Sequence, residues 1–515
     1  MANSNSTHHS YWLSTSALRK KHEPLAGRVK TEIAILGGGI TGLSTALELL
    51  DRGHQVSVVE ALTVGAGTTG GSTGHLDAHP EREPGRLVSQ HGVENVRLMV
   101  AARLQAIDLI EQRCTPECDF RRIPGYRYTD SPLIQGNDQG DPPPRLVSAN
   151  ELEADMRAAT DVGLNVVWTP APPIPRGGFG YRVENMARFN SLIYVQHLAD
   201  LVAERGGKIY ERSLASGPVE PKPTELKVGE GVIEFDQVVC AVHCNYTDVL
   251  RTYFQTPPYQ SYVLAARVKN PPPDALFWDT TEPYYYTRRA NSDDPELIIV
   301  GGCDKRTGAH KSDEVARALL DYVRARYDVR EIVAQWSAEL FEPVDNMPII
   351  GKVPGKENVW VATGLSGVGL TWGTAAGKIL AEQITGRTTP LDDLLSPKRL
   401  ALDSIGTLIS EHTTTTADYL QRVLPAHRFD ADKLSPGEGA VGVDNHQHVA
   451  ACRDVQGCLH KHSPICPHMG GVVHWNAAEQ TWDCPVHGGR FTADGQRLYG
   501  PPEGNLAAPG ETAKE

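Results

Sequence analysis

The sequence lacks any apolar run long enough to cross a membrane. Of its 515 residues 40% are hydrophobic, yet no stretch approaches the ~18 consecutive apolar residues that span a bilayer. Residues 1–6 contain no basic start followed by an apolar segment, so no export signal is predicted. We therefore expect a globular, cytoplasmic protein without a membrane span, long enough for two or three domains.

An excess of basic residues is also missing. The chain has 50 Lys and Arg against 63 Asp and Glu, a formal net charge of −13, and no basic stripe interleaved with aromatic residues. Nucleic acid is therefore excluded as an expected partner. Of the nine cysteines, two belong to a motif described below. The remaining odd number in a cytosolic chain predicts reduced thiols rather than disulfides.

A glycine-rich turn follows the first strong strand pattern. Residues 31–36 are apolar enough for a buried strand, and a helical pattern follows the turn. In such a turn Gly37 permits the tight bend, Gly39 lets backbone amides approach a pyrophosphate, and Gly42 permits close packing of helix on strand. The helix dipole favours the anion as well. This arrangement predicts a Rossmann-like α/β unit that binds a dinucleotide.

An acidic residue completes this unit. The next predicted strand, residues 55–59, ends at Glu60. A carboxylate about twenty residues beyond the glycines accepts hydrogen bonds from ribose hydroxyls. Strand, turn, helix, strand and terminal acid together favour dinucleotide binding far more than an isolated glycine triplet does.

Three further glycine-rich segments distinguish FAD from NAD. Residues 65–74, 345–351 and 359–370 resemble the D-amino-acid oxidase, glycine oxidase and sarcosine oxidase family of flavoproteins, over residues 31–400. The resemblance implies FAD, a strand at 235–241 beside the adenine, and a mixed-sheet substrate domain at about 145–303. It also implies that the flavin is lined by a later set of residues, namely Asp345, Gly364, Gly367, Gly369 and Leu370.

A short segment suggests that the FAD is covalently attached. Residues 71–75, Gly-Ser-Thr-Gly-His, resemble the segment by which dimethylglycine and sarcosine dehydrogenases attach FAD through a histidine nitrogen. Ser72, Thr73 and His75 therefore join the expected FAD-binding residues. The alternative is that His75 only lies near the flavin or caps a helix, and four matching residues leave both interpretations open.

The substrate site is less well defined. Residues 276–289 are rich in aromatic and polar side chains, and strand alternation places Tyr284, Tyr286 and Arg288 on one face. Aromatic walls exclude water, and an arginine binds a carboxylate through two parallel hydrogen bonds. An ordinary hairpin with exposed tyrosines remains the alternative. Thr371 stands where monomeric sarcosine oxidases place a lysine for the substrate carboxylate, so the resemblance implies an amine or amino-acid-like substrate without identifying it.

Two Cys-His pairs lie near the C-terminus. Cys466-Pro-His468 and Cys484-Pro-Val-His487 are separated by fifteen residues, an order in which two thiolates hold one iron and two imidazoles the other iron of a Rieske [2Fe–2S] centre. Structural zinc is the alternative, since two Cys and two His also suit tetrahedral Zn²⁺. The segment resembles a small, all-β Rieske domain. We assign it residues 434–515, with residues 401–433 as a connector and residues 1–30 as an N-terminal extension.

The Rieske resemblance has departures that bear on the redox potential. Respiratory members carry a disulfide cysteine where Gly471 stands and hydroxyl residues where Gly489 and Phe491 stand. Hydrogen bonds to the cluster sulfurs stabilise the reduced state. Their loss predicts a midpoint in the lower part of the roughly −150 to +300 mV Rieske range.

The combination of cofactors predicts a dehydrogenase. FAD takes two electrons as hydride from a C–H bond beside nitrogen or oxygen, whereas a Rieske cluster takes one electron at a time. We therefore expect electrons from the substrate to reach an external acceptor through the cluster. Two alternatives remain: the cluster delivers electrons to the flavin, or the Rieske module is a redox-sensing or docking domain. A Rieske oxygenase is disfavoured, because no two-His-one-carboxylate iron site is evident.

Overall fold

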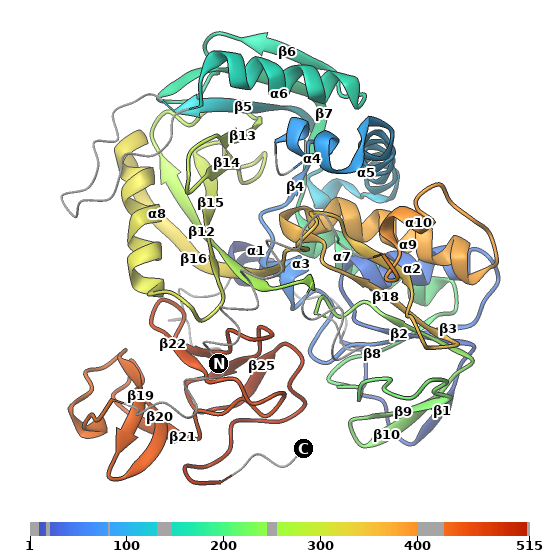
Figure 1. The fold of residues 1–515 in the computed structure, drawn as a ribbon, viewed down its shortest axis with the longest axis vertical. Helices are drawn as coiled ribbons and strands as arrows, with labels where there is room; N and C mark the ends of the chain where they lie inside the picture. Colours follow the sequence, from blue (N-terminus) through green and yellow to red (C-terminus); the bar gives the residue numbers. More distant parts are fainter. Residues whose placement is uncertain are drawn as a thin grey trace.

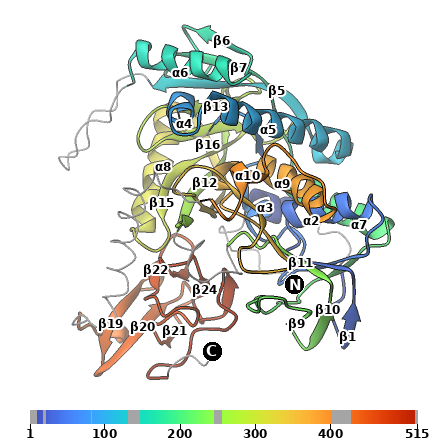
Figure 2. The same ribbon diagram turned by 45° about the vertical axis from the view of Figure 1, so that its right-hand side comes forward.

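The computed structural model describes residues 10–16, 21–80, 83–130, 147–244, 255–399 and 427–511. Most of the expected connector, residues 401–426, lies outside the described residues. Figures 1 and 2 show the chain folded around two large sheets with a smaller C-terminal domain.

The first large sheet has six strands in the order β17-β18-β11-β2-β3-β8. Its strands are β2 (Ile33–Leu36), β3 (Val56–Val59), β8 (Lys208–Tyr210), β11 (Gln237–Cys240), β17 (Ile349–Lys352) and β18 (Val359–Thr363). All pair in parallel except β17. Every residue of β2 and β3 is buried, as expected of parallel strands covered on both faces. The predicted Rossmann-like unit is confirmed.

Helices cover one face of this sheet and strands the other. The helical layer contains α2 (Ile40–Leu50), α7 (Ser191–Glu204) and α9 (Gly369–Ile384), and α2 packs against both others. The opposite face carries a three-stranded sheet of β1 (Arg28–Lys30), β10 (Gly231–Glu234) and β9 (Glu225–Val228). Successive residues of β2 alternate between the two layers: Ile33 and Ile35 join the helical core, and Ala34 and Leu36 the other.

The second large sheet has nine strands and is mixed. Eight follow the order β16-β12-β15-β14-β13-β5-β7-β4, and β6 pairs with β7. Their bounds are β4 (His75–Leu76), β5 (Arg121–Asp130), β6 (Val166–Thr169), β7 (Gly177–Arg188), β12 (Pro258–Val268), β13 (Leu276–Asp279), β14 (Tyr285–Arg289), β15 (Leu297–Arg306) and β16 (Val329–Phe341). The sheet confirms the expected mixed architecture but draws on more of the chain than residues 145–303.

The remaining helices lie around these two sheets. They are α1 (Tyr11–Thr15), α3 (Thr68–Gly71), α4 (Pro84–His91), α5 (Val93–Arg113), α6 (Ala149–Asp161), α8 (Ser312–Arg326) and α10 (Asp392–Leu395). Helix α8 packs on β12 and β15. Part of the N-terminal extension is integrated into the fold, because Trp12 in α1 is buried and its indole Nε1 donates to the carbonyl of Ser72 at 2.7 Å. No helix among the described residues has the length and apolar character needed to cross a bilayer.

The C-terminal domain consists of two antiparallel sheets. One contains β19 (Gly439–Asp444), β20 (Gln447–Arg453) and β21 (Leu459–His462), and the other β22 (His474–Asn476), β23 (Thr481–Asp483), β24 (Arg490–Thr492) and β25 (Arg497–Tyr499). Residues 427–433 pack with this domain: Arg428 bridges Val443, and Ala431 is fully buried. The domain, drawn in orange and red, lies against the end of the nine-stranded sheet near β15, β16 and α8 (Figures 1 and 2).

Candidate cofactor and substrate sites

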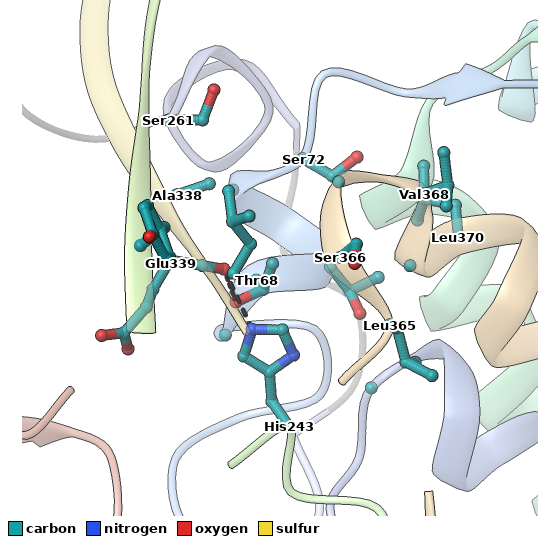
Figure 3. Close-up of a pocket in the computed structure, with 18 of the residues that line it drawn as sticks. Thr68, Ser72, His243, Ser261, Ala338, Glu339, Leu365, Ser366, Val368 and Leu370 are labelled. Carbon is teal, nitrogen blue, oxygen red and sulfur yellow. Dashed lines mark hydrogen bonds between the residues drawn. The ribbon is translucent and has the colours of Figure 1, made fainter. Parts of the chain in front are cut away.

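A cavity of about 670 Å³ runs between the two large sheets, and its wall includes residues 497–500 of the C-terminal domain. This volume suits a cofactor with a small substrate. Figure 3 shows part of the wall, where Thr68 and Ser72 face Leu365, Ser366 and Val368 from the opposite side.

The glycine turn forms one end of this cavity. Gly37 has φ +108°, and a Cβ there would lie 2.4 Å from the carbonyl oxygen of Ala241. A Cβ at Gly42 would lie 2.0 Å from the carbonyl oxygen of Gly37, which is the close helix-on-strand packing expected of this position. Gly39 lines the cavity and is the N-cap of α2, so the positive end of the helix dipole faces the space where a pyrophosphate fits.

Glu60 is held beside the same turn. One carboxylate oxygen accepts a hydrogen bond from the Gly38 amide at 2.7 Å and the other from the Leu62 amide at 2.8 Å. Burial raises the pKa of Glu60, while the two amides act in the opposite direction. The carboxylate lies at the end of β3 on the cavity wall, a placement that fits ribose recognition.

The middle of the cavity is lined by most of the segment 67–75, including Ser72, Thr73 and His75. Ser72 Oγ accepts a hydrogen bond from the Gly74 amide at 3.0 Å, and Thr73 Oγ1 lies 3.0 Å from His75 Nδ1. His75 Nε2 is buried and has no hydrogen-bond partner among the described residues. Burial, reinforced by the charge of Arg288, lowers the pKa of His75 well below its usual value. A neutral imidazole with an unpartnered nitrogen at the cavity fits a position next to a flavin.

Only part of the late glycine-rich segment lines the cavity. Gly367, Gly369 and Leu370 line it, as expected, but Asp345, Gly364 and Thr371 do not. Asp345 forms an ion pair with Arg399 at 2.7 Å. Gly364, at φ +65°, packs against Pro343. Thr371 Oγ1 donates to the carbonyl of Val368 at 3.1 Å, so this hydroxyl is committed to its own helix.

Tyrosines from β14 and its preceding turn line the other end. Tyr286 lines the cavity with its hydroxyl 3.1 Å from Ser261 Oγ, and the Tyr284 hydroxyl donates to Asp304 at 2.7 Å. Burial raises the pKa of Tyr286, so the phenol stays protonated.

Arg288 does not line this cavity, in contrast to the carboxylate clamp expected from the sequence. Its guanidinium is fully buried and donates to the backbone carbonyls of Thr73 at 2.6 Å, Phe189 at 3.3 Å, and Arg289 and Ala290. Tyr286 and Arg288 lie two residues apart on β14, as the predicted strand alternation requires. At position 288, however, backbone carbonyl oxygens accept the hydrogen bonds of the guanidinium.

Three polar residues at the substrate end were not singled out from the sequence. Asp77, His79 and Arg127 all line the cavity, whereas the intervening Leu76 and Ala78 are fully buried in the core. The alternation of His75, Asp77 and His79 along the chain was a signal that could have identified this wall.

The same residues belong to a buried polar network. His79 Nε2 lies 2.7 Å from the Tyr181 hydroxyl, which donates to Asp155 at 2.9 Å, and Arg127 Nε lies 2.9 Å from the same carboxylate oxygen. Burial lowers the pKa of His79 well below its usual value. It raises the pKa of Asp77 to about 6, although the neighbouring Arg103 lowers it.

The two Cys-His loops converge in the C-terminal domain. Cys466 and Cys484 are 3% and 2% exposed, and the rings of His468 and His487 have centroids 5.0 Å apart. The loops share their backbone pattern: each cysteine amide donates to the carbonyl five residues later, at 2.8 Å in both. Burial lowers the pKa of the two histidines, to about 4 and about 3 respectively, which keeps both imidazoles neutral, the form that binds metal.

The four candidate ligands are arranged by type. Cys466 and Cys484 form a thiol pair, and His468 and His487 form an imidazole pair, as the two bridged irons of a Rieske centre require. A Cβ at Gly471 would lie 3.0 Å from Cys484 Sγ, and one at Gly489 would lie 3.5 Å from Cys466 Sγ, so glycines leave room around the sulfurs.

Comparison with known proteins agrees with both sites. The sequence model of the FAD dependent oxidoreductase family matches residues 32–383, and that of the Rieske [2Fe-2S] domain matches residues 427–509. The chain belongs to the FAD dependent oxidoreductase family. It is an oxidoreductase whose cofactors are FAD and, in its C-terminal Rieske domain, a [2Fe–2S] cluster.

Similar proteins share one or both parts of this FAD dependent oxidoreductase. YhfW of Bacillus subtilis, named as a Rieske 2Fe-2S iron-sulfur protein, is 27% identical over 504 residues, covering 95% of each chain. Gamma-glutamylputrescine oxidoreductase of Escherichia coli is 22% identical over 74% of this chain and 90% of its own. Glycine oxidase from Geobacillus kaustophilus shares the fold, with a TM-score of 0.58 and 18% identity over 72% of this chain and 99% of its own.

Proposed function

We propose that this protein is a dehydrogenase that oxidises an amine or amino-acid-like small molecule with FAD and passes the electrons, through its Rieske cluster, to an external one-electron acceptor. The observation that carries the proposal is the wall of the cavity. Arg497, Leu498, Tyr499 and Gly500 of the Rieske domain line the same cavity as the glycine turn of the FAD domain. One chain therefore brings the two cofactor sites together.

The chemistry of FAD and of the Rieske cluster supports these two roles. When bound, FAD supplies hydride acceptance and the cluster supplies single-electron transfer. The protein residues bind and orient FAD at the glycine turn and Glu60, and enclose the reacting end with Tyr284, Tyr286 and Trp278. Water exclusion by such aromatic walls strengthens the interactions of charged groups inside.

The polar wall at the substrate end supports an amino-acid-like substrate. Arg127 is the buried cation of this wall, and it takes the role that was expected of Arg288. Its side chain is 13% exposed and keeps donors besides the Nε that faces Asp155, so it can hold a carboxylate. His79, neutral through burial, adds an uncharged polar group to this wall. The similarity to gamma-glutamylputrescine oxidoreductase supports an amine.

Covalent attachment of FAD through His75 is part of the proposal. The unpartnered Nε2 of His75 at the cavity supports it. We expect acid precipitation to leave yellow flavin in the protein pellet, and to release it from the His75→Ala variant, as measured by absorbance of the supernatant. Complete release of flavin from the native protein would exclude the bond, and His75 would then be a neighbour of FAD only.

Anaerobic reduction tests the proposed activity. Purified protein is mixed with a panel of amines and amino acids, and flavin absorbance and the electron paramagnetic resonance signal of the reduced cluster are followed. Flavin bleaching followed by a cluster signal supports the dehydrogenase. Bleaching with a silent cluster favours the alternative of a docking or sensing module. Oxidation of a pre-reduced cluster by FAD, with no substrate able to bleach the flavin, favours the reverse direction.

A further inference from the structure

The Rieske domain contacts the FAD domain through the loop that carries its second pair of ligands, residues 484–488. Gly308, in the turn after β15 of the FAD domain, faces this loop. A Cβ at Gly308 would lie 2.8 Å from the Asp483 carbonyl oxygen and 3.2 Å from Pro485. Only glycine leaves the backbone room to approach this closely.

A second glycine makes the matching contact from the Rieske side. Gly488 follows the ligand His487, and a Cβ there would lie 2.1 Å from Oε1 of Glu339 in β16. Glu339 is 3% exposed, and its Oε1 accepts a hydrogen bond from Thr307 at 3.2 Å. Each domain thus carries a glycine where the other domain leaves no space for a side chain.

Glu339 also reaches the cavity from the same position. Its backbone carbonyl accepts a hydrogen bond from Thr68 Oγ1 at 3.2 Å and lies 2.9 Å from His243 Nε2. In Figure 3 this carbonyl faces Thr68 and His243, while the carboxylate points away toward the red ribbon of the Rieske domain. A single residue therefore separates the FAD cavity from the second ligand loop.

Buried polar contacts fix the two domains beside these glycines. Glu479 accepts hydrogen bonds from the backbone amide of Ser337 at 2.7 Å and from its hydroxyl. Asp483 accepts one from Gln260 at 3.1 Å. Arg490 pairs with both carboxylates within the Rieske domain. Such charge-assisted bonds are strong and directional when buried.

The two histidine ligands are not equivalent in this arrangement. His487 is 6% exposed and lies on the loop packed against the FAD domain, whereas His468 is partly exposed on the other loop. Tyr499 also lies on the side of the Rieske domain that faces the FAD domain. Its ring centroid is 6.2 Å from that of His243, and its hydroxyl is 3.4 Å from Thr68 Oγ1. The inner edge of the cluster site thus faces the FAD cavity.

We propose that the Rieske domain is permanently docked through the close contacts that Gly308 and Gly488 allow, the latter against Glu339, so that electrons cross from FAD to the cluster within one chain on the His487 side. This inference rests on the proposed function. For each substrate oxidised, two electrons leave reduced FAD singly, each converting one ferric iron to ferrous. The external one-electron acceptor removes each in turn, and the flavin proton goes to solvent.

The experiment begins from photoreduced flavin, so no substrate has to be known. In the holoprotein under anaerobic conditions, the rate of cluster reduction is measured after a light pulse in the presence of a sacrificial donor. The native rate should be independent of protein concentration. Gly308→Ala should slow it severalfold, because the added methyl group pushes the two domains apart and electron transfer weakens steeply with the distance between the centres. Flavin photoreduction and the contents of FAD, iron and sulfide should remain unchanged.

Gly355→Ala is the matched control. Gly355 has φ +76°, close to the +67° of Gly308, but a Cβ there would meet nothing within 4 Å. It therefore reproduces the backbone strain without the interdomain contact, and its cluster should be reduced at the native rate. Equal slowing in both variants, or none in Gly308→Ala, would overturn the docking proposal.

A double variant is the control for a folding defect. Gly488→Ala should slow cluster reduction, and adding Glu339→Ala removes the side chain with which the new methyl group collides, so the rate should recover. No recovery in the double variant would count against docking at Glu339. If photoreduced flavin never reduces the cluster of the native protein, the proposed electron transfer itself is wrong. If transfer is fast in the native protein and in all variants, only the docking proposal is wrong.

Discussion

At the scale of single residues, two arginines near the substrate end of the cavity have different roles. Arg127 and Arg288 are both buried arginines near Tyr286. Arg127 lines the cavity beside Asp155, whereas Arg288 satisfies its donors on four backbone carbonyls. The residue type predicted a carboxylate-binding group in this region, but only position along the strand decides which arginine reaches the cavity.

Arg127 is expected to act on substrate affinity. Losing a charged hydrogen-bond partner costs about 1.5–3 kcal/mol, so Arg127→Leu should raise KM for a carboxylate substrate by about tenfold to a hundredfold, with a smaller effect on kcat. Steady-state kinetics with an amine that lacks the carboxylate provide the control, because its KM should stay near the native value. A comparable rise in KM for both substrates would show that Arg127 only supports the fold of the site.

Phe491 bears on the redox potential of the cluster. It is fully buried in the core of the Rieske domain, at a position where respiratory relatives carry a hydroxyl. We expect a native midpoint in the lower half of the roughly −150 to +300 mV range, and a positive shift in Phe491→Tyr, because a hydroxyl donor stabilises the reduced cluster. Spectroscopic redox titration measures both. Val455→Ser, at a side chain 61% exposed, should leave the midpoint unchanged.

At the scale of elements, the β2–α2 unit was predictable because its signals are local. The apolar strand, the glycine turn and the helix that follows occur at β2 and α2 as expected. In the nine-stranded sheet the pairing partners come from distant segments: β13 pairs with β5 in parallel across about 150 residues, whereas β14 is its near neighbour in the chain. Such pairings have no local sequence signal, so the sequence alone did not indicate which segments outside residues 145–303 join this sheet.

Gly42 tests the packing of the β2–α2 unit. In Gly42→Ala the new methyl group would lie 2.0 Å from the Gly37 carbonyl, and such overpacking costs about 1–3 kcal/mol. We expect a lower urea midpoint and a lower flavin content of the purified protein, because a distorted turn impairs FAD incorporation, as measured by flavin absorbance per protein after gel filtration. The control is Gly85→Ala in α4, where the Cβ would meet Ala158 only at 3.9 Å. A native flavin content in Gly42→Ala would contradict the assigned role of the turn.

At the scale of the whole molecule, the main finding is that the cofactor domains share a wall. The sequence indicated each domain separately. In the structure Gly308 and Gly488 lie at the contact between the domains. The FAD cavity is therefore completed by residues that lie more than 400 positions beyond the glycine turn.

Cooperativity between the domains should depend on Glu479. Its side chain is 9% exposed and joins Arg490 to Ser337, and weakening a buried charged hydrogen bond costs about 1–3 kcal/mol. We expect the rise in flavin fluorescence and the bleaching of the cluster to coincide on heating in the native protein, and the cluster transition to move to lower temperature in Glu479→Gln. Glu503 also contacts the FAD domain, at Gly217, but is exposed, so Glu503→Gln should change little.

The sequence by itself determined the cofactors of this protein. The β2–α2 turn and the two Cys-His loops are local, and their ligand geometry follows from short segments whose backbone conformation glycine and proline dictate. The tertiary structure alone decided that Arg127 rather than Arg288 reaches the cavity, and that Gly308 and Glu339 meet the second ligand loop. These outcomes depend on which distant strands pair and which surfaces bury each other, and no contiguous stretch of sequence specifies that.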